Sequence, residues 1–329
     1  MGLLSFFRRK GADKNKSAEA IVNTTSPAEQ NYSENKSAEA AANTTSPAEQ
    51  NYTENKSTEA AMNDSSQAEQ NETCMPDEKS PNSTSNPPKV QPIYAVITSH
   101  LQDGVLPDGF SLGERYNTGF VPGAKDGIGL YHMHPVQPDP ERSKKILEVL
   151  TLISEEEGTE HVDRIMNIFE ELDRQDSIAR LFDEINHTIY INHAKLDLQS
   201  ILGFGDYLIC YGVSFLAVKA GLTLLGGFKV PFVEDVCLEL GAYEEFTYFA
   251  ARILSNGNWE KGNEDLFKLA KQLRGWGRIF AVDYLRPETQ EIKDWLLFEG
   301  SENDIVPQYS ADVCLQKAGA LERLILFSF

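Results

Sequence analysis

From Ser143 to the end of the chain, large apolar residues recur at the spacing of an α-helix. Positions i, i+3, i+4 and i+7 lie on one helix face, so each such segment has one apolar face to bury. The pattern is clearest at Ile146, Val149, Leu150 and Ile153; Val162, Ile165, Phe169 and Leu172; Ile178, Leu181, Phe182 and Ile185; Phe246, Phe249, Ala250 and Ile253; and Leu266, Leu269, Ala270 and Leu273. Short amphipathic helices cannot bury these faces alone, but helices stacked in pairs can. The sequence therefore predicts a mainly α protein, with a HEAT-like helical repeat array over residues 143–329.

Residues 275–300, GWGRIFAVDYLRPETQEIKDWLLFEG, have the pattern of one helix-turn-helix unit of such an array. Arg286–Pro287 interrupts the first apolar stripe, because proline lacks the N–H that a helix interior uses. Thr289 is a residue type that caps a helix N-terminus, and Gly300 is one that ends a helix.

Residues 207–228, YLICYGVSFLAVKAGLTLLGGF, form the most apolar stretch. A membrane span needs ~20 apolar residues, so the length alone would allow one. Lys219 stands inside the stretch, and a charge there costs ~3 kcal/mol on insertion scales. We therefore expect a buried core helix.

Within residues 1–90, the part from residue 11 onward is built from Asn, Ser, Thr, Ala, Glu, Lys and Pro, with almost no large apolar residue beyond Ile21, Tyr32, Tyr52 and Met62. Such a composition cannot bury enough apolar surface to offset the entropy of ordering the backbone, which predicts a disordered tail. Over residues 15–74 the tail repeats every twenty residues, as 15–34, 35–54 and 55–74.

The chain starts MGLLSFFRRK, with apolar residues before basic ones. A secretory signal has the reverse order, which argues against export. Residues 3–10 could instead contact a membrane surface, with the apolar side chains in lipid and the basic ones on anionic head groups. An ordinary frayed start is the alternative.

Residues 91–142 have a different pattern. YAVITSH (94–100) alternates and is rich in β-branched residues, and GIGLYHMH (127–134) follows a loop rich in Gly and Pro. Both segments predict strands, so we expect a small β-containing segment here.

The composition bounds the function and the compartment. Thirty Lys and Arg residues against fifty Asp and Glu give a formal net charge of −20. So acidic a chain repels phosphate backbones, which disfavours nucleic-acid binding. Four cysteines stand far apart without a Cys-x-x-Cys pair. This usage is typical of a reducing compartment, so we expect a cytoplasmic protein.

The candidate metal site is His132-Met133-His134. On a strand, residues i and i+2 project to one face, so both imidazoles could reach one metal ion, with His100 or Asp126 as third ligand. The alternative is a pair of loop histidines. We find no G-x-G-x-x-G after a strand and no P-loop, and Glu244–Glu245 is interpreted as a solvated helix face.

At SFLAVKAGLTLLGGF (214–228), GAYEEFTYFAARIL (241–254) and residues 275–300, the chain resembles a group of Bacillus-type bacterial proteins named limonene hydroxylases. The resemblance covers about residues 91–329, and the MGLLSFFRRK start is similar too. It implies a monooxygenase acting on the monoterpene limonene, giving carveol and perillyl alcohol with NAD(P)H as reductant and NAD-linked oxidation of the alcohols. An apolar groove lined by Phe246, Tyr248, Phe249 or Trp276 could hold the terpene, although aromatic residues at helical spacing are more often core.

Two hypotheses remain. The resemblance implies a terpene-oxidising enzyme, for which no catalytic residue is identified and the cofactor is unknown beyond the implied NAD(P)H. The residues themselves favour a non-enzymatic helical-repeat scaffold that binds a protein partner through its acidic face.

Overall fold

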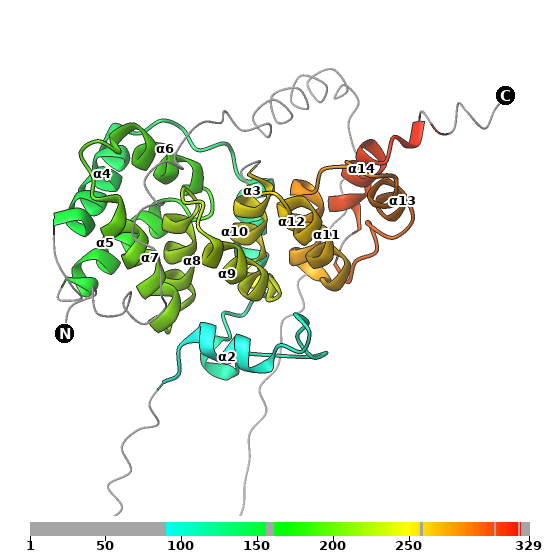
Figure 1. Cartoon of the computed structure of the whole chain (residues 1–329), viewed down its shortest axis with the longest axis horizontal. Coiled ribbons are helices and arrows are strands. Elements are labelled where there is room, and N and C mark those ends of the chain that lie inside the picture. Colours follow the sequence, from blue (N-terminus) through cyan, green and yellow to red (C-terminus); the bar gives the residue numbers. More distant parts are fainter. Residues whose placement is uncertain (1–89, 156–160, 257–258, 306, 322, 324–329) are drawn as a thin grey trace, which may run out of the picture. The chain divides into compact units, whose positions relative to one another are not determined.

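The computed structural model describes residues 90–155, 161–256, 259–305, 307–321 and 323 (Figure 1). The predicted disordered tail, its twenty-residue repeats and the predicted membrane contact at residues 3–10 all lie outside the described residues, Val90 excepted.

The described residues are mainly helical, and the only β-structure among them is an isolated bridge between Gln102 and Val105. In chain order the α-helices are α2 (Ile93–His100), α3 (Ala124–His132), α4 (Pro140–Glu155), α5 (Val162–Gln175), α6 (Phe182–Asn192), α7 (Leu198–Tyr211), α8 (Phe215–Leu225), α9 (Pro231–Gly241), α10 (Glu244–Ser255), α11 (Gly262–Gln272), α12 (Gly275–Tyr284), α13 (Gln290–Phe298) and α14 (Gln308–Lys317). A short 3-10 helix, η2 (Glu114–Tyr116), interrupts the loop between α2 and α3.

Consecutive helices pack as pairs: α4 with α5, α7 with α8, α9 with α10, α11 with α12, and α13 with α14. Alternate helices also pack together, because α8 lies against α10, α10 against α12, and α12 against α14, while α9 lies against α11. Pairs that stack on the next pair are the arrangement of a helical repeat, and the order can be followed by colour in Figure 1. The predicted mainly α, repeat-like fold is confirmed.

Side-chain caps fix where several of these helices begin. The Asp197 carboxylate accepts the N–H of Gln199 at the start of α7, and the Thr289 hydroxyl accepts the N–H of Ile292 at the start of α13. Such a bond satisfies one of the N–H groups that a helix N-terminus leaves without a partner. The break predicted at Arg286–Pro287 is confirmed, because α12 ends just before it and α13 begins just after it.

The strand predicted over residues 94–100 is wrong, because these residues belong to α2. Ile93 and Ile97 stand one helical turn apart and are both fully buried. α2 packs on α7, α8 and α9, and its first N–H donates to the carbonyl oxygen of Gly212 at 2.9 Å. Strand propensity is a weak preference, and packing of this helical face overrides it.

The second predicted strand, residues 127–134, is also wrong, since α3 extends to His132. The helix lies close against α12: a Cβ on Gly127 would come within 2.1 Å of the Trp276 ring, so only glycine fits. Residues 91–142 thus contain no strand among the described residues, and Ile93, Ile97 and Ala124 join the same hydrophobic core as the later helices.

The apolar stretch 207–228 is not one helix. It divides into the end of α7 and the whole of α8, with a break at Gly212, and Lys219 is buried in α8. The expected burial is confirmed for α8, whereas the expectation of a single core helix is wrong because the helix breaks at Gly212. Within the described part of the chain, the helices are too short or too polar to cross a bilayer.

Candidate functional site

The strand geometry assumed for the histidine pair is absent. His132 is the last residue of α3, and His134 lies two residues beyond it. Nε2 of His132 lies 2.5 Å from the Tyr309 hydroxyl, and Arg180 donates a hydrogen bond to the His134 carbonyl oxygen. Over the described residues no group of three or more His, Cys, Asp or Glu side chains could hold a metal ion. The metal site at His132 and His134 stays a prediction without a third ligand.

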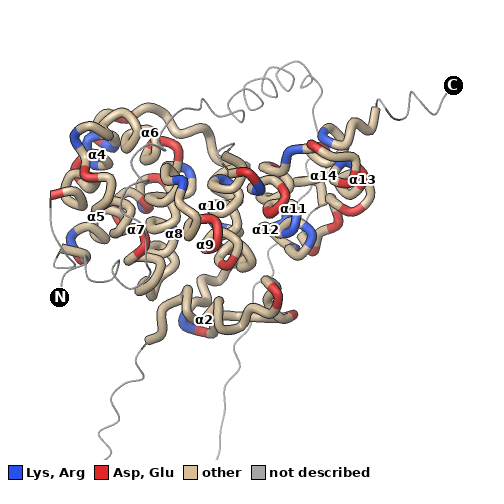
Figure 2. Tube along the Cα trace, viewed as in Figure 1, with Lys and Arg blue, Asp and Glu red and all other residues tan. Residues whose placement is uncertain are grey.

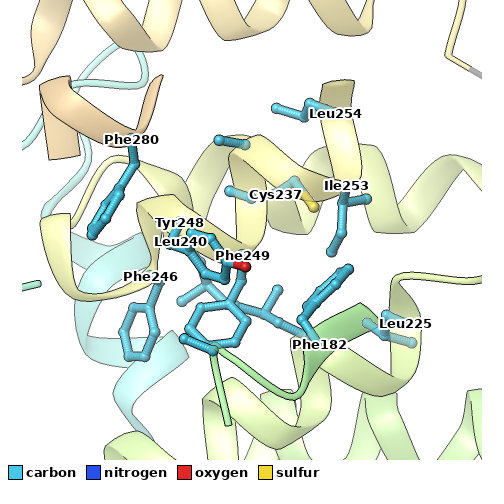
Figure 3. Close-up of a cluster of buried hydrophobic side chains, with 14 of the residues drawn as sticks. Phe182, Leu225, Cys237, Leu240, Phe246, Tyr248, Phe249, Ile253, Leu254 and Phe280 are labelled. Carbon is cyan, nitrogen blue, oxygen red and sulfur yellow. The ribbon is translucent and has the colours of Figure 1, made fainter. Parts of the chain in front are cut away.

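The aromatic residues considered for a terpene groove are core residues. Phe246, Tyr248, Phe249 and Trp276 are all buried, and Figure 3 shows the first three inside a packed apolar cluster. The rings of Tyr248 and Phe249 meet edge to face, with centroids 5.2 Å apart. Edge-to-face contacts of this kind stabilise a core. The three side chains of α10 therefore pack this helix against its neighbours, and Trp276 belongs to the core through α12.

A buried ionic cluster joins α3, α8 and α10. Nζ of Lys219 lies 2.6 Å from Oδ2 of Asp126 and 2.5 Å from Oε1 of Glu245. The exposed fractions are 5% for Lys219, 2% for Asp126 and 8% for Glu245. The other oxygen of Glu245 accepts the N–H of Gly123 at 2.7 Å, directly before α3. Asp126, considered above as a metal ligand, instead anchors α3 to the body.

The cluster places one ammonium between two carboxylates. Burial alone would lower the pKa of Lys219, but Asp126 and Glu245 more than offset it and hold that pKa above its ordinary value. Burial raises the pKa of Asp126, and the ammonium of Lys219 opposes the rise. Lys219 therefore stays protonated at neutral pH. A protonated, doubly paired lysine is a poor nucleophile, so the cluster fastens helices together.

A second buried cation, Arg278 of α12, ties α12 to the neighbouring loops. Its guanidinium donates to four carbonyl oxygens, those of Lys271, Leu273, Glu299 and Glu302. Burial lowers the pKa of Arg278 to about 10, so the group remains charged at neutral pH. Its guanidinium carbon lies 5.3 Å from the centroid of the Trp295 ring, and this cation–π contact holds the ring in place.

The Trp295 ring forms part of the floor of a groove of about 610 Å³ between α11 and α13. Phe267 of α11 meets Trp295 edge to face, with ring centroids 5.4 Å apart, and both side chains are buried. Phe298, the last residue of α13, lines the same groove and is 72% exposed. The groove thus has an aromatic floor with one ring open to solvent.

The rim of this groove is acidic. Hydrogen bonds from Arg323 and Gln290 lower the pKa of Asp294 below its ordinary value, so this carboxylate is anionic at neutral pH. The Nζ of Lys271 lies 4.2 Å from the centroid of the Phe267 ring. Figure 2 shows acidic residues on α13 and beyond its C-terminal end. The charged side chains that line the groove are Lys271, Glu291, Asp294 and Glu299. Lys271 pairs with Glu291 at 3.9 Å and Arg323 pairs with Asp294 at 2.7 Å, so these three carboxylates exceed the two cations by one.

A smaller cavity of about 290 Å³ lies beside the loop that precedes α3. Tyr116, Phe120 and Tyr243 contribute aromatic rings to its lining, and Glu114 contributes a carboxylate. Its volume is at the lower end of the range in which small-molecule sites occur.

The implied nicotinamide cofactor does not fit the glycine pairs of this chain. Gly203 and Gly205 lie inside α7, away from its N-terminus. Gly275 and Gly277 do stand at the start of α12, where a pyrophosphate would bind in a dinucleotide site. That position is taken by the Glu244 carboxylate, which accepts the N–H of Gly277 at 3.4 Å. A carboxylate there would repel a phosphate.

The interpretation of Glu244–Glu245 as a solvated helix face is wrong. The Glu245 carboxylate pairs with Lys219, and the Glu244 carboxylate reaches from α10 to the N-terminus of α12. Burial raises the pKa of Glu244 to about 7, although hydrogen bonds from two backbone N–H groups oppose the rise. A lysine inside an apolar run needs a buried counter-charge, so Lys219 itself signalled the cluster. Its partners could not be read from the sequence, because they lie on two other helices.

The chain matches no protein-family model, no curated protein and no solved structure.

Proposed function

We propose that this chain is a non-enzymatic helical-repeat scaffold that binds a protein partner in the groove between α11 and α13. The observation that carries the proposal is the aromatic floor beneath a rim of carboxylates, with Phe298 72% exposed. Solvent-exposed aromatic rings beside a buried tryptophan are typical of the energetic centre of an interface, because covering them removes apolar surface from water.

The charges of the groove define the chemistry of the partner. The rim keeps an excess of carboxylates over cations and attracts Arg or Lys, with Glu299 outside the two ion pairs, and the floor accepts aliphatic or aromatic side chains. Arginine suits both, since its guanidinium pairs with carboxylates and stacks on aromatic rings. We therefore propose a partner segment that combines apolar and basic residues. The formal charge of −20 would speed its encounter at low salt.

A cytoplasmic location is part of the proposal. Among the described residues Cys237 and Cys314 are buried thiols outside any disulfide, and such usage is typical of a reducing compartment.

The test is a panel of fluorescein-labelled ten-residue peptides that vary the number of Phe, Leu and Arg residues. We expect apolar-basic peptides to bind, acidic or purely polar ones to fail, and affinity to fall as salt rises. Phe298→Ala should weaken binding at least tenfold, because it removes the open ring of the floor. Phe120→Ala is the matched control: it removes an exposed Phe from the other cavity and should leave the affinity unchanged. Equal losses in both variants would contradict the assignment to this groove.

Limonene hydroxylation, which the family resemblance implies, stays a prediction. Purified protein that converts limonene to carveol with NADH and O₂ would replace the scaffold proposal by an enzymatic one. Carveol formation that is lost in His132→Ala or His134→Ala would further place the chemistry at the histidine pair.

A further inference from the structure

We propose that the N-terminal segment of this chain, residues 3–10, occupies the groove between α11 and α13 and competes there with a protein partner. The proposal rests on the groove being a docking surface, and it names one ligand for it. The segment reads LLSFFRRK: four large apolar residues precede three basic ones.

The composition of this segment complements both the apolar floor and the charged rim of the groove. The Leu and Phe side chains match the exposed Phe298 ring, and the basic side chains match a rim on which the carboxylates outnumber the cations. Eight residues reach at most ~28 Å when extended, and the nine residues of α13 span ~14 Å. The segment is therefore long enough to cover the floor and the rim together.

Because the segment is tethered to the fold, it can occupy the groove even if its intrinsic affinity for the groove is low. About 80 residues separate residue 10 from Val90, and they can extend over ~260 Å, so every face of the fold is within reach. A tethered ligand acts at an effective concentration of the order of 1 mM when its linker can span the distance. A segment with a Kd of about 100 µM would then fill the groove about nine times in ten.

Occupancy of this kind has a measurable consequence. An external peptide must displace the tethered segment, so its apparent affinity for the full chain falls about tenfold below its intrinsic value. Removing the apolar residues of the segment should restore that affinity without touching the groove.

The experiment uses a fluorescein-labelled peptide with the sequence of residues 2–11, GLLSFFRRKG, titrated by anisotropy. It is added to the full chain and to the full chain carrying Phe6→Ser and Phe7→Ser. We expect about tenfold tighter binding to the double variant. In the double-variant background, Phe298→Ala should abolish most of the gain, whereas Phe120→Ala should preserve it. Because Phe298 is exposed, its loss leaves the fold intact.

Equal affinity for the full chain and the double variant would overturn the inference, as would binding that survives Phe298→Ala. If this peptide fails while other apolar-basic peptides bind the groove, only the inference falls and the proposed scaffold stands. If no peptide binds, both fall.

A membrane surface is the competing ligand for residues 3–10. Vesicles of phosphatidylcholine with about 30% phosphatidylserine carry the negative charge that such a segment recognises. Co-sedimentation with vesicles that is lost in the Phe6→Ser, Phe7→Ser variant, combined with an unchanged peptide affinity, would assign the segment to membranes and overturn the inference.

Discussion

Replacing Lys219 by methionine should destabilise this protein by about 4 kcal/mol. The substitution keeps most of the side-chain volume but leaves Asp126 and Glu245 facing each other in a buried site. At an effective dielectric constant of ~20, each of the two contacts, at 2.6 and 2.5 Å, supplies ~6 kcal/mol of attraction. Desolvation costs several kcal/mol per ion, and removing one member of a buried ionic group typically costs ~3–5 kcal/mol. For a fold of this size, that corresponds to a fall in Tm of ~8–16 °C.

The assay is urea unfolding followed by circular dichroism at pH 7 and pH 5. If the loss is electrostatic, it should shrink at pH 5. Burial already raises the pKa of Asp126, and loss of the Lys219 ammonium removes the interaction that opposes this rise. A carboxyl whose pKa is higher in the folded state than in the unfolded state stabilises the fold at low pH. That stabilisation is lost as the pH rises through the folded-state pKa. Neutralising both carboxylates, by Asp126→Asn and Glu245→Gln in the Lys219→Met background, should recover part of the stability.

Lys195→Met is the matched control, because Lys195 is exposed in a turn; its effect should stay within about 0.5 kcal/mol. A loss for Lys219→Met that stays below 1 kcal/mol would refute the reasoning. A loss that neither shrinks with acid nor recovers in the triple variant would assign the effect to packing.

Three further predictions concern α3, α10 and α12. Gly127→Ala should cost ~1–3 kcal/mol in urea unfolding because its Cβ would overlap the Trp276 ring, whereas Gly129→Ala in the same helix has 3.4 Å of clearance and should be neutral or stabilising. Arg278→Met should cost at least ~3 kcal/mol, since four carbonyl oxygens lose their donor; a Tm within 2 °C of the parent chain would contradict this. Burial raises the pKa of Glu244 to about 7, so its contribution to stability should fall as pH rises from about 4.5 through 7, and Glu244→Gln should flatten the Tm profile over that window.

Part of the fold and little of the candidate site could be predicted from the sequence. The helices from residue 143 onward were predictable because apolar spacing is a local property, and the boundary at Arg286–Pro287 followed from the chemistry of proline. The strands expected over residues 94–100 and 127–134 were wrong because packing against other helices, which is not a local property, decides the structure of such short segments. Short segments with mixed signals take the structure that their neighbours allow, and here Ile93 and Ile97 pack as one helical face.

The groove shows why the site was harder to predict. Phe267 and Trp295 each have the pattern of an ordinary core position, and only the spacing of α11 and α13 leaves an opening above them. Phe298 continues the apolar stretch of α13, so its exposure could not be read from its neighbours in the chain.

By itself the sequence determined that this chain builds short amphipathic helices, that they must pair to bury their apolar faces, and that the protein is strongly acidic. Those properties follow from spacing and composition, which need no knowledge of distant residues. Only the tertiary structure decided that Lys219 meets Asp126 and Glu245, and that Phe298 stays open beside carboxylates. Both outcomes depend on how separate helices approach one another, and that is set by the packing of the whole core.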